Sequence, residues 1–149
     1  MKNINIKIFN YKIKNKLPKY ETNGSAGLDL RACIKNKKII FPKKKYLIPS
    51  GIGIYIKDKN ITSLIIPRSG LAHKYNLILG NTIGLIDSDY QGQIMISILN
   101  RGKKEFIIEP MMRIAQMIFI PLIKINWNLV EDFKKNKRNN KGFGSTGLI

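Results

Sequence analysis

Residues 93–99 read QIMISIL, and this stretch decides the fold class because isoleucine occupies every second position from Ile94 to Ile98. The same two-residue alternation occurs in GIGIYIK at 51–57 and in NINIKIF at 3–9. Successive side chains of a β-strand point to opposite faces, so this period is typical of strands that bury one face. The three stretches therefore predict three strands of an all-β protein.

Further short apolar segments continue this pattern along the chain. They are residues 38–41, 46–48, 61–66, 78–86, 105–108, 113–122 and 125–130. Turn-forming residues separate them, such as Pro-Ser-Gly at 49–51 and Asn-Arg-Gly at 100–102. The best candidate for a helix is the short SGLAHKY at 69–75. Many short strands at regular spacing predict a jelly-roll-like β-barrel or sandwich.

The C-terminal part of the chain has a different composition. Residues 134–149 read KKNKRNNKGFGSTGLI, which is polar, basic and rich in glycine. Such a segment buries little apolar surface and is typical of a mobile terminus. We therefore expect one β domain over residues 1–133 and a flexible C-terminal arm over residues 134–149.

The composition excludes several classes of protein. Cys33 is the only cysteine and His73 the only histidine, which excludes an internal disulfide and metal centres built from Cys or His. The N-terminus alternates apolar and charged residues and so does not have the form of a signal peptide. No uncharged apolar run approaches the ~20 residues that span a bilayer. We therefore expect a soluble, cytoplasmic protein with no membrane contact.

The net charge of the 149-residue chain is +18, with a pI of about 10.1, which invites comparison with nucleic-acid-binding proteins. However, 22 of the 27 basic residues are lysines, and they are spread along most of the chain. This distribution favours a solvated lysine-rich surface. Such a surface attracts polyanions only in a nonspecific, salt-dependent way, so we expect no specific nucleic-acid partner.

Five polar segments interrupt the strand pattern and carry the candidate chemistry. They are AGLDLRA at 26–32, PRSGLA at 67–72, NTIGLIDSDYQG at 81–92, RIAQ at 113–116 and RNNKGFGSTG at 138–147. Taken alone, each is ambiguous. Asp29 can cap local backbone or orient water around a metal ion. Ser69 can be an ordinary helix N-cap or, beside Arg68, part of an anion site.

The other three segments also allow a structural and a functional interpretation. The acids at 87 and 89 stand at the tip of a predicted hairpin, either as turn residues or as functional groups. The polar residues Arg113 and Gln116 can simply decorate an edge strand. Phe143 lies between two glycines on the arm, where an aromatic ring is well suited to stacking on a base.

In this order and spacing, the five segments resemble the five motifs of the trimeric deoxyuridine triphosphatase (dUTP nucleotidohydrolase) family. The resemblance extends from Ile4 to the C-terminus. It implies a jelly-roll-like domain that forms a homotrimer, with each active site at a subunit interface and closed by another subunit's arm. The implied reaction cleaves dUTP to dUMP and pyrophosphate with Mg²⁺, which limits uracil in DNA and supplies dUMP for thymidylate synthesis.

The resemblance also assigns roles to individual residues. It makes Asp87 the general base that activates water and Asp29 the metal-site acid, acting indirectly through the water shell of a Mg²⁺ ion held mainly by the phosphates. The remaining matches are substrate-binding positions. They are Arg68, Ser69, Gly70, Gln116, Arg138, Gly144, Ser145 and Thr146 for the phosphates, Asn81, Gly84 and Ile86 for uracil, Tyr90 for deoxyribose, and Phe143 for stacking on the base.

Two alternative functions belong to other classes. A dCTP deaminase shares the architecture, but the DSDY sequence at 87–90 looks like the hydrolase version. A basic single-strand nucleic-acid-binding protein would need aromatic residues interleaved on a basic face, whereas the arm has one and the hairpin tip is acidic. Outside the motifs, we expect His73 at the surface or a helix end and Cys33 buried as a small apolar residue.

Overall fold

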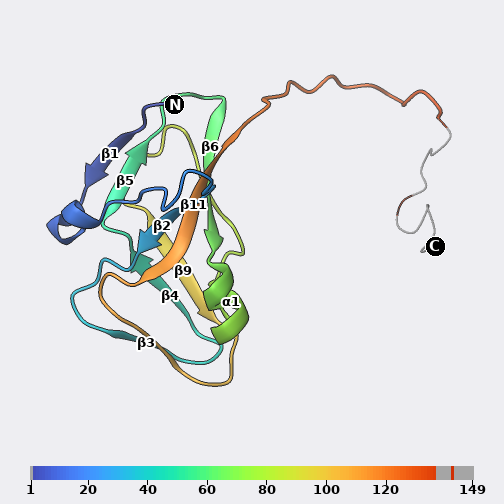
Figure 1. The fold of residues 1–149 in the computed structure, drawn as a ribbon. Coiled ribbons are helices and arrows are strands. Elements are labelled where there is room, and N and C mark those ends of the chain that lie inside the picture. The colour runs from blue at the N-terminus through green and yellow to red at the C-terminus, as the bar shows by residue number, and fades with distance from the viewer. Residues whose placement is uncertain (1, 137–141, 143–149) are drawn as a thin grey trace.

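The computed structural model describes residues 2–136 and 142 and shows a β domain with one short α-helix in that part of the chain (Figure 1). The strands are β1 (Asn5–Ile8), β2 (Leu28–Arg31), β3 (Lys38–Ile40), β4 (Lys45–Pro49), β5 (Ile52–Tyr55), β6 (Ile61–Pro67), β7 (Leu77–Leu79), β8 (Gly84–Ile86), β9 (Met95–Asn100), β10 (Phe106–Ile108) and β11 (Arg113–Pro121). A 3₁₀ helix, η1 (Tyr11–Lys16), follows β1, and the α-helix α1 (Ser69–Tyr75) follows β6.

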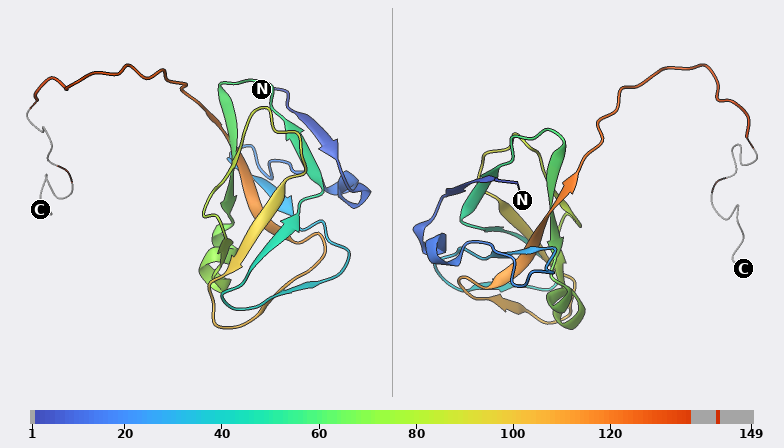
Figure 2. Two further views of the ribbon diagram at one scale, coloured as in Figure 1. Left: turned by 180° about the vertical axis from the view of Figure 1, so that it is seen from behind. Right: turned by 45° about the horizontal axis from the view of Figure 1, so that its top comes forward.

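All strand pairs in the described chain are antiparallel, and they form four sheets. The largest has the order β2-β11-β6-β8, and a second has the order β4-β9-β7. Two-stranded sheets, β1-β5 and β10-β3, complete the domain. The sheets lie against one another as a sandwich and do not close into a barrel, as the views in Figure 2 show. The all-β, jelly-roll-like prediction is therefore confirmed in its sandwich form.

The alternating isoleucines form the core between the sheets. Ile52, Ile54 and Ile56 are at most 3% exposed, and Ile94, Ile96 and Ile98 are each 1% exposed. Burying such side chains contributes roughly 1.5–3 kcal/mol each, so these two stretches supply much of the driving force for folding. The stretch at 3–9 differs, because β1 pairs only with β5 and leaves Ile6 45% exposed.

The helix α1 occupies the predicted residues 69–75, but its N-cap is not Ser69. Arg68 holds the N-cap position in an extended conformation and makes no side-chain cap bond. The helix ends at Asn76, whose backbone has the left-handed φ of 55° and whose N–H donates to the carbonyls of Ala72 and Leu71. The simple capping interpretation of Ser69 is therefore wrong.

Two strand predictions are wrong. The segment 78–86 is two strands, β7 and β8, because the backbone turns between them and Thr82 takes a positive φ of 64°. The segment 125–130 has no strand. Beyond Leu122, whose N–H donates to the Asn60 carbonyl at 2.7 Å, the described residues up to 136 lead away from the domain (Figure 1). A strand needs a backbone partner, and this segment finds none among the described residues.

The two residues outside the motifs lie where the sequence predicted. Cys33 is 3% exposed, and burial raises the pKa of its thiol. His73 is exposed in the last turn of α1. Among the described residues, no helix has the length and apolar character that crossing a membrane requires.

Gly51 provides a test of this packing. Its φ is +81°, and a Cβ atom placed on it would lie 2.7 Å from Cys33 Sγ and 2.9 Å from Cys33 Cβ. Gly51→Ala therefore adds both backbone strain and overpacking, and we expect a loss of about 2–4 kcal/mol in the free energy of unfolding, measured by urea denaturation. Gly24→Ala is the control, since nothing lies within 4 Å of its Cβ. Equal stability of the two variants would contradict this packing.

Candidate active site

A cleft of about 570 Å³ lies against the four-stranded sheet and brings three of the five sequence motifs together. The strand order places β2, β11 and β6 side by side, with Asp29 opposite Gln116 and Gln116 opposite Ile66. The cleft is lined by Glu21, Ser25, Ala26, Gly27, Asp29, Arg68, Ser69, Gly70, Leu71, Lys74, Tyr75 and Gln116. Segments far apart in sequence therefore meet at one cleft.

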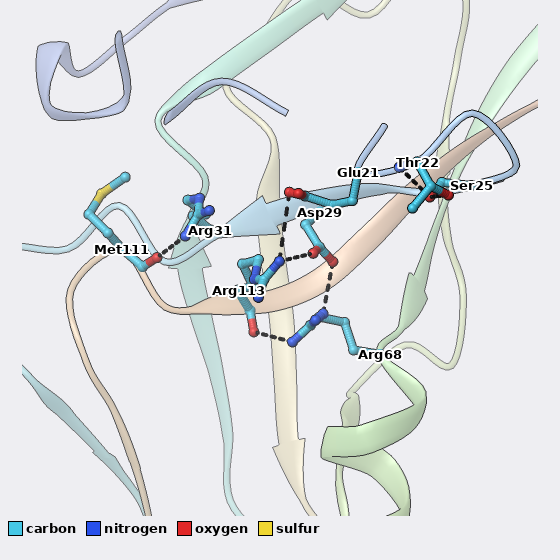
Figure 3. Close-up of polar contacts among 8 residues, drawn as sticks. All are labelled: Glu21, Thr22, Ser25, Asp29, Arg31, Arg68, Met111 and Arg113. Carbon is cyan, nitrogen blue, oxygen red and sulfur yellow. Dashed lines mark hydrogen bonds and ion pairs between the residues drawn. The ribbon is translucent and has the colours of Figure 1, made fainter. Parts of the chain in front are cut away.

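The Asp29 carboxylate is the centre of an ion cluster beside this cleft. Arg68 Nε donates to Asp29 Oδ1 at 2.8 Å, and Arg113 Nη1 donates to Asp29 Oδ2 at 3.1 Å (Figure 3). The Asp29 side chain is 16% exposed, whereas those of Arg68 and Arg113 are 32% and 41% exposed. Charge-assisted hydrogen bonds from both sides thus hold a half-buried carboxylate in one orientation.

A β-bulge in β11 makes this cluster possible. The pairing of β11 with β2 shifts between Arg113 and Ala115, so that Arg113 lies opposite Arg31. Residues three apart face opposite sides of a regular strand, but one extra residue returns Arg113 to the face of Gln116. The sequence predicted Gln116 as a site residue but did not predict Arg113 as one. The signal was the i, i+3 spacing of two polar residues inside an apolar strand.

The start of α1 supplies the part of the cleft that suits an anion. Ser69 and Gly70 are exposed at the cleft, and the first N–H groups of a helix have no acceptor within it. A Cβ atom at Gly70 would meet nothing within 4 Å, so the space in front of the backbone is open. With Arg68 and Lys74 on the same lining, these groups can bind a phosphate.

Gln116 is held at the cleft by its neighbours. Its Nε2 donates to the carbonyl of Pro67 at 2.9 Å, which fixes the amide and leaves its Oε1 on the side of Gly27. A Cβ atom on Gly27 would lie 2.5 Å from Gln116 Oε1, so a larger residue would displace the amide. Gly27 thus keeps room for Gln116, a role that was not predicted from the sequence.

The hairpin residues predicted to bind the base lie on a different part of the molecule. Gly84 and Ile86 are in β8, and the carbonyl of Ile86 accepts from Thr62 Oγ1 at 2.7 Å. Asn81 is exposed in the turn before β8, with its Nδ2 3.5 Å from the position of a Cβ on Gly84. The backbone of β8 therefore forms an edge of the sheet with Asn81 beside it.

Asp87 and Tyr90 follow β8 in a tight turn. The N–H of Tyr90 donates to the Asp87 carbonyl at 3.2 Å, and the Tyr90 hydroxyl donates to the Gln93 carbonyl at 3.0 Å. A Cβ on Gly92 would lie 2.4 Å from the Tyr90 hydroxyl oxygen, so glycine makes room for that ring. Asp87 is exposed, and within the described part of the chain its carboxylate takes part in no ion pair or hydrogen bond.

Within one chain, the cleft and the hairpin are separated. Asp29 lies on β2 and Asp87 follows β8, and these are the two edge strands of the same sheet. Three strand spacings of about 4.8 Å correspond to roughly 14 Å across the sheet. None of the residues lining the cleft belongs to 81–92. The remaining predicted positions, Arg138, Phe143, Gly144, Ser145 and Thr146, lie outside the described residues.

The donor set at the cleft fits an indirect metal contact. The described residues contain no group of three or more His, Cys, Asp or Glu side chains that could hold a metal ion. Both oxygens of Asp29 already accept from arginines. A hard cation such as Mg²⁺ needs about six oxygen ligands and keeps several waters. Asp29 therefore suits contact with a metal-bound water better than direct coordination.

Solved structures of similar shape are known. A mutant dUTPase of Staphylococcus bacteriophage 80alpha, determined with dUpNHpp, superposes with a TM-score of 0.81 and 22% identity, covering 99% of this chain and 100% of that chain. A mutant dUTPase from phage phi11 of S. aureus, which coordinates a structural Mg(II) ion, gives a TM-score of 0.80 and 19% identity over 90% of this chain and 100% of that chain. At these identities the likeness shows a shared fold.

Sequence comparisons are closer. The family model described as dUTPase matches residues 3–147. The deoxyuridine 5'-triphosphate nucleotidohydrolase of Nitrosospira multiformis is 50% identical over 147 residues, which cover 99% of both chains. The protein of that name from Photorhabdus laumondii is 50% identical over 149 residues, covering 99% of this chain and 98% of its own length. Matches of this extent and identity show that the chain belongs to the dUTPase family.

Proposed function

We propose that this protein is a dUTP diphosphatase that hydrolyses dUTP to dUMP and pyrophosphate. The observation that carries the proposal is the register of β2, β11 and β6, which gathers Asp29, Gln116 and the start of α1 at one cleft. Relatives of about 50% identity, matching nearly the whole chain, bear the name of this activity. The roles of the individual site residues belong to the same proposal.

The cleft binds the triphosphate. Arg68 keeps N–H donors that its bonds to Asp29 and the Arg113 carbonyl do not use, and the start of α1 adds backbone N–H groups at Ser69 and Gly70. Gln116 presents an amide fixed by Pro67. Phosphoryl transfer depends mainly on positioning and charge neutralisation, which these groups provide. Mg²⁺ bound by the phosphates would neutralise further charge, and Asp29 would hold one of its waters.

Asp87 acts as the general base. Its exposed carboxylate, without an ion pair or hydrogen bond in the described chain, is free to accept a proton from a water molecule. That water attacks the α-phosphorus in line with the oxygen that bridges to the β-phosphorus. The bond to the bridging oxygen breaks, pyrophosphate leaves with the electron pair, and Asp87 holds the proton. General-base assistance of this kind contributes about 10²–10⁴-fold.

The hairpin and the arm provide the specificity. The backbone edge of β8 and the Asn81 amide hydrogen-bond to uracil, and a cytosine at the same place leaves polar groups unpaired. The hairpin excludes the 5-methyl group of thymine sterically. The Tyr90 ring lies under the deoxyribose, where a 2′-hydroxyl finds no room. Phe143 stacks on the base, while Arg138, Gly144, Ser145 and Thr146 bind the distal phosphates.

The active unit is a homotrimer with sites at the subunit interfaces, located in the cytoplasm. One dUTP bound at Asp29 does not bring its α-phosphate next to an Asp87 roughly 14 Å away across the sheet, so the hairpin of another copy supplies the base. Exposed apolar side chains support such an assembly. Leu47 and Leu85 are 66% and 62% exposed, and Trp127 and Leu129 in the extended segment are 92% and 98% exposed.

The proposal predicts pyrophosphate release from dUTP in the presence of Mg²⁺, with kcat/KM at least about 10²-fold above that for dCTP, dTTP or UTP. Asp87→Asn keeps the shape of the side chain but not its basicity, so kcat falls by about 10²–10⁴-fold while binding of a non-hydrolysable dUTP analogue persists. Asp89→Asn is the matched control, because it changes the same charge two residues away and keeps most of the activity.

Three results would contradict the proposal. An Asp87→Asn variant that retains more than about a tenth of wild-type turnover excludes the general-base role. Pyrophosphate release without preference for dUTP excludes the specificity assigned to the hairpin. Ammonia release from dCTP shows the deaminase reaction of the same fold.

A second prediction concerns the C-terminal arm. Deletion of residues 134–149 leaves a folded trimer with a melting temperature close to that of the full chain, because the last strand among the described residues ends at Pro121. Activity falls at least about 100-fold, since the deletion removes the Phe143 stack, which is worth about 1–3 kcal/mol, together with the phosphate contacts of the arm. Light scattering, thermal melting and the pyrophosphate assay measure these effects. A dissociated or fully active truncated protein would overturn the role given to the arm.

A further inference from the structure

We propose that Arg113 is a positioning residue, which fixes the Asp29 carboxylate with its guanidinium and the Arg68 guanidinium with its own backbone carbonyl. The inference rests on the proposed function and deepens it, because Asp29 and Arg68 are the groups that face the metal-bound triphosphate. Arg113 itself is absent from the residues that line the cleft, so it acts through its neighbours.

The contacts around Arg113 form a closed triangle. Arg68 Nε holds Asp29 Oδ1, Arg113 Nη1 holds Asp29 Oδ2, and Arg68 Nη1 donates to the Arg113 carbonyl at 3.4 Å (Figure 3). With one arginine on each oxygen, the carboxylate plane cannot rotate without losing a charge-assisted hydrogen bond. Loss of the Arg113 guanidinium frees Oδ2 and leaves Asp29 attached to Arg68 alone.

The same contacts also fix the orientation of the Arg68 N–H groups that are not bonded within the triangle. A guanidinium is a rigid planar fork, so two fixed contacts orient the whole group. Arg68 meets Asp29 on β2 and the Arg113 carbonyl on β11, which are separate strands of the sheet. If Asp29 turns, Arg68 turns with it, and the donors aimed into the cleft lose their positions. A displacement of about 1 Å can cost 10²-fold in rate.

The β-bulge shows that the irregular backbone of β11 determines where Arg113 lies. Its cost is a disrupted stretch of the β2–β11 ladder, and its effect is to turn Arg113 toward Asp29. Arg31, which lies opposite Arg113 in the register, makes no such contact. Its Nη1 donates to the Met111 carbonyl at 3.0 Å, on the other side of the view in Figure 3. Arg31 and Arg113 are thus neighbours on paired strands, but of the two only Arg113 binds Asp29 in the described chain.

Charge balance has to be distinguished from positioning. Glu21 Oε1 lies 3.7 Å from Arg113 Nη1, so two carboxylates and two guanidiniums neutralise one another in the cluster. Removing Arg113 also leaves excess negative charge near a triphosphate. If Arg113 acts only through its charge, its loss should lower activity even when Asp29 has been replaced. If Arg113 acts by positioning Asp29, its loss should have no further effect once the Asp29 carboxylate is gone.

The experiment is a double-mutant cycle on the full chain with Arg113→Gln, Asp29→Asn and the combined variant. We expect Arg113→Gln to lower kcat/KM for dUTP by about 10–100-fold, mainly in kcat. In the Asp29→Asn background the same change should have less than about a threefold effect, because there is no carboxylate left to position. Arg113→Lys keeps the charge and should recover part of the loss. Arg31→Gln, the control of equal charge, should stay within about threefold of wild type.

A readout without turnover accompanies the kinetics. Calorimetric titration of Mg²⁺ into protein with a non-hydrolysable imido analogue of dUTP should show weaker Mg²⁺ affinity for Arg113→Gln and unchanged affinity for Arg31→Gln. A merely structural role would lower the melting temperature and leave this affinity unchanged. If Arg113→Gln fails to fold, Arg113→Lys completes the cycle with Asp29→Asn.

The possible outcomes separate this inference from the proposed function. A wild-type protein that releases no pyrophosphate from dUTP overturns the proposed function, and the inference with it. An active wild type in which the two substitutions are additive overturns the positioning role alone. An Arg31→Gln effect equal to that of Arg113→Gln does so as well, since it assigns the loss to net charge.

Discussion

The register of β11 is the constraint on which the candidate site depends. This strand lies between β2 and β6, and its pairing sets Asp29 opposite Gln116 and Gln116 opposite Ile66. A slip of one residue would turn Gln116 into the core and Met117 into the cleft, because side chains alternate along a strand. Buried Ala115 and Met117, at 0% and 3% exposure, oppose such a slip. The apolar core therefore holds the polar site in place.

Much of the fold was predictable, because the alternation of isoleucine reports burial directly. The helix at 69–75 and the buried strands around Ile54 and Ile96 agree with the prediction. The failures have physical causes. Residues 125–130 have the pattern of a strand, but pairing depends on a partner that the described chain lacks. The Ser69 cap failed because the preceding residue, Arg68, takes the N-cap position and turns its guanidinium to Asp29.

The candidate site was predictable as a set of motifs but not as a geometry. The resemblance pointed to Asp29, Arg68 and Gln116, and the structure brings them to one cleft. It could not show that a β-bulge adds Arg113 to the cluster, because a bulge changes the face of a residue without a residue type that marks it. Nor could the motif order show that Asp87 follows β8, the edge strand opposite the one that carries Asp29. Under the proposed function, that separation is the reason why the hairpin of a second copy is needed.

The central claim is that the cleft of one copy works with the hairpin of another, and subunit complementation tests it most directly. Asp87→Asn keeps an intact cleft, and Arg68→Ala keeps an intact hairpin. The two variants are unfolded together in equal amounts and refolded, and they should form mixed trimers. In about a quarter of the interfaces an intact cleft should then meet an intact hairpin, so activity should be near a quarter of wild type. Mixed trimers no more active than either variant alone would show that each chain carries a whole site and would contradict the account.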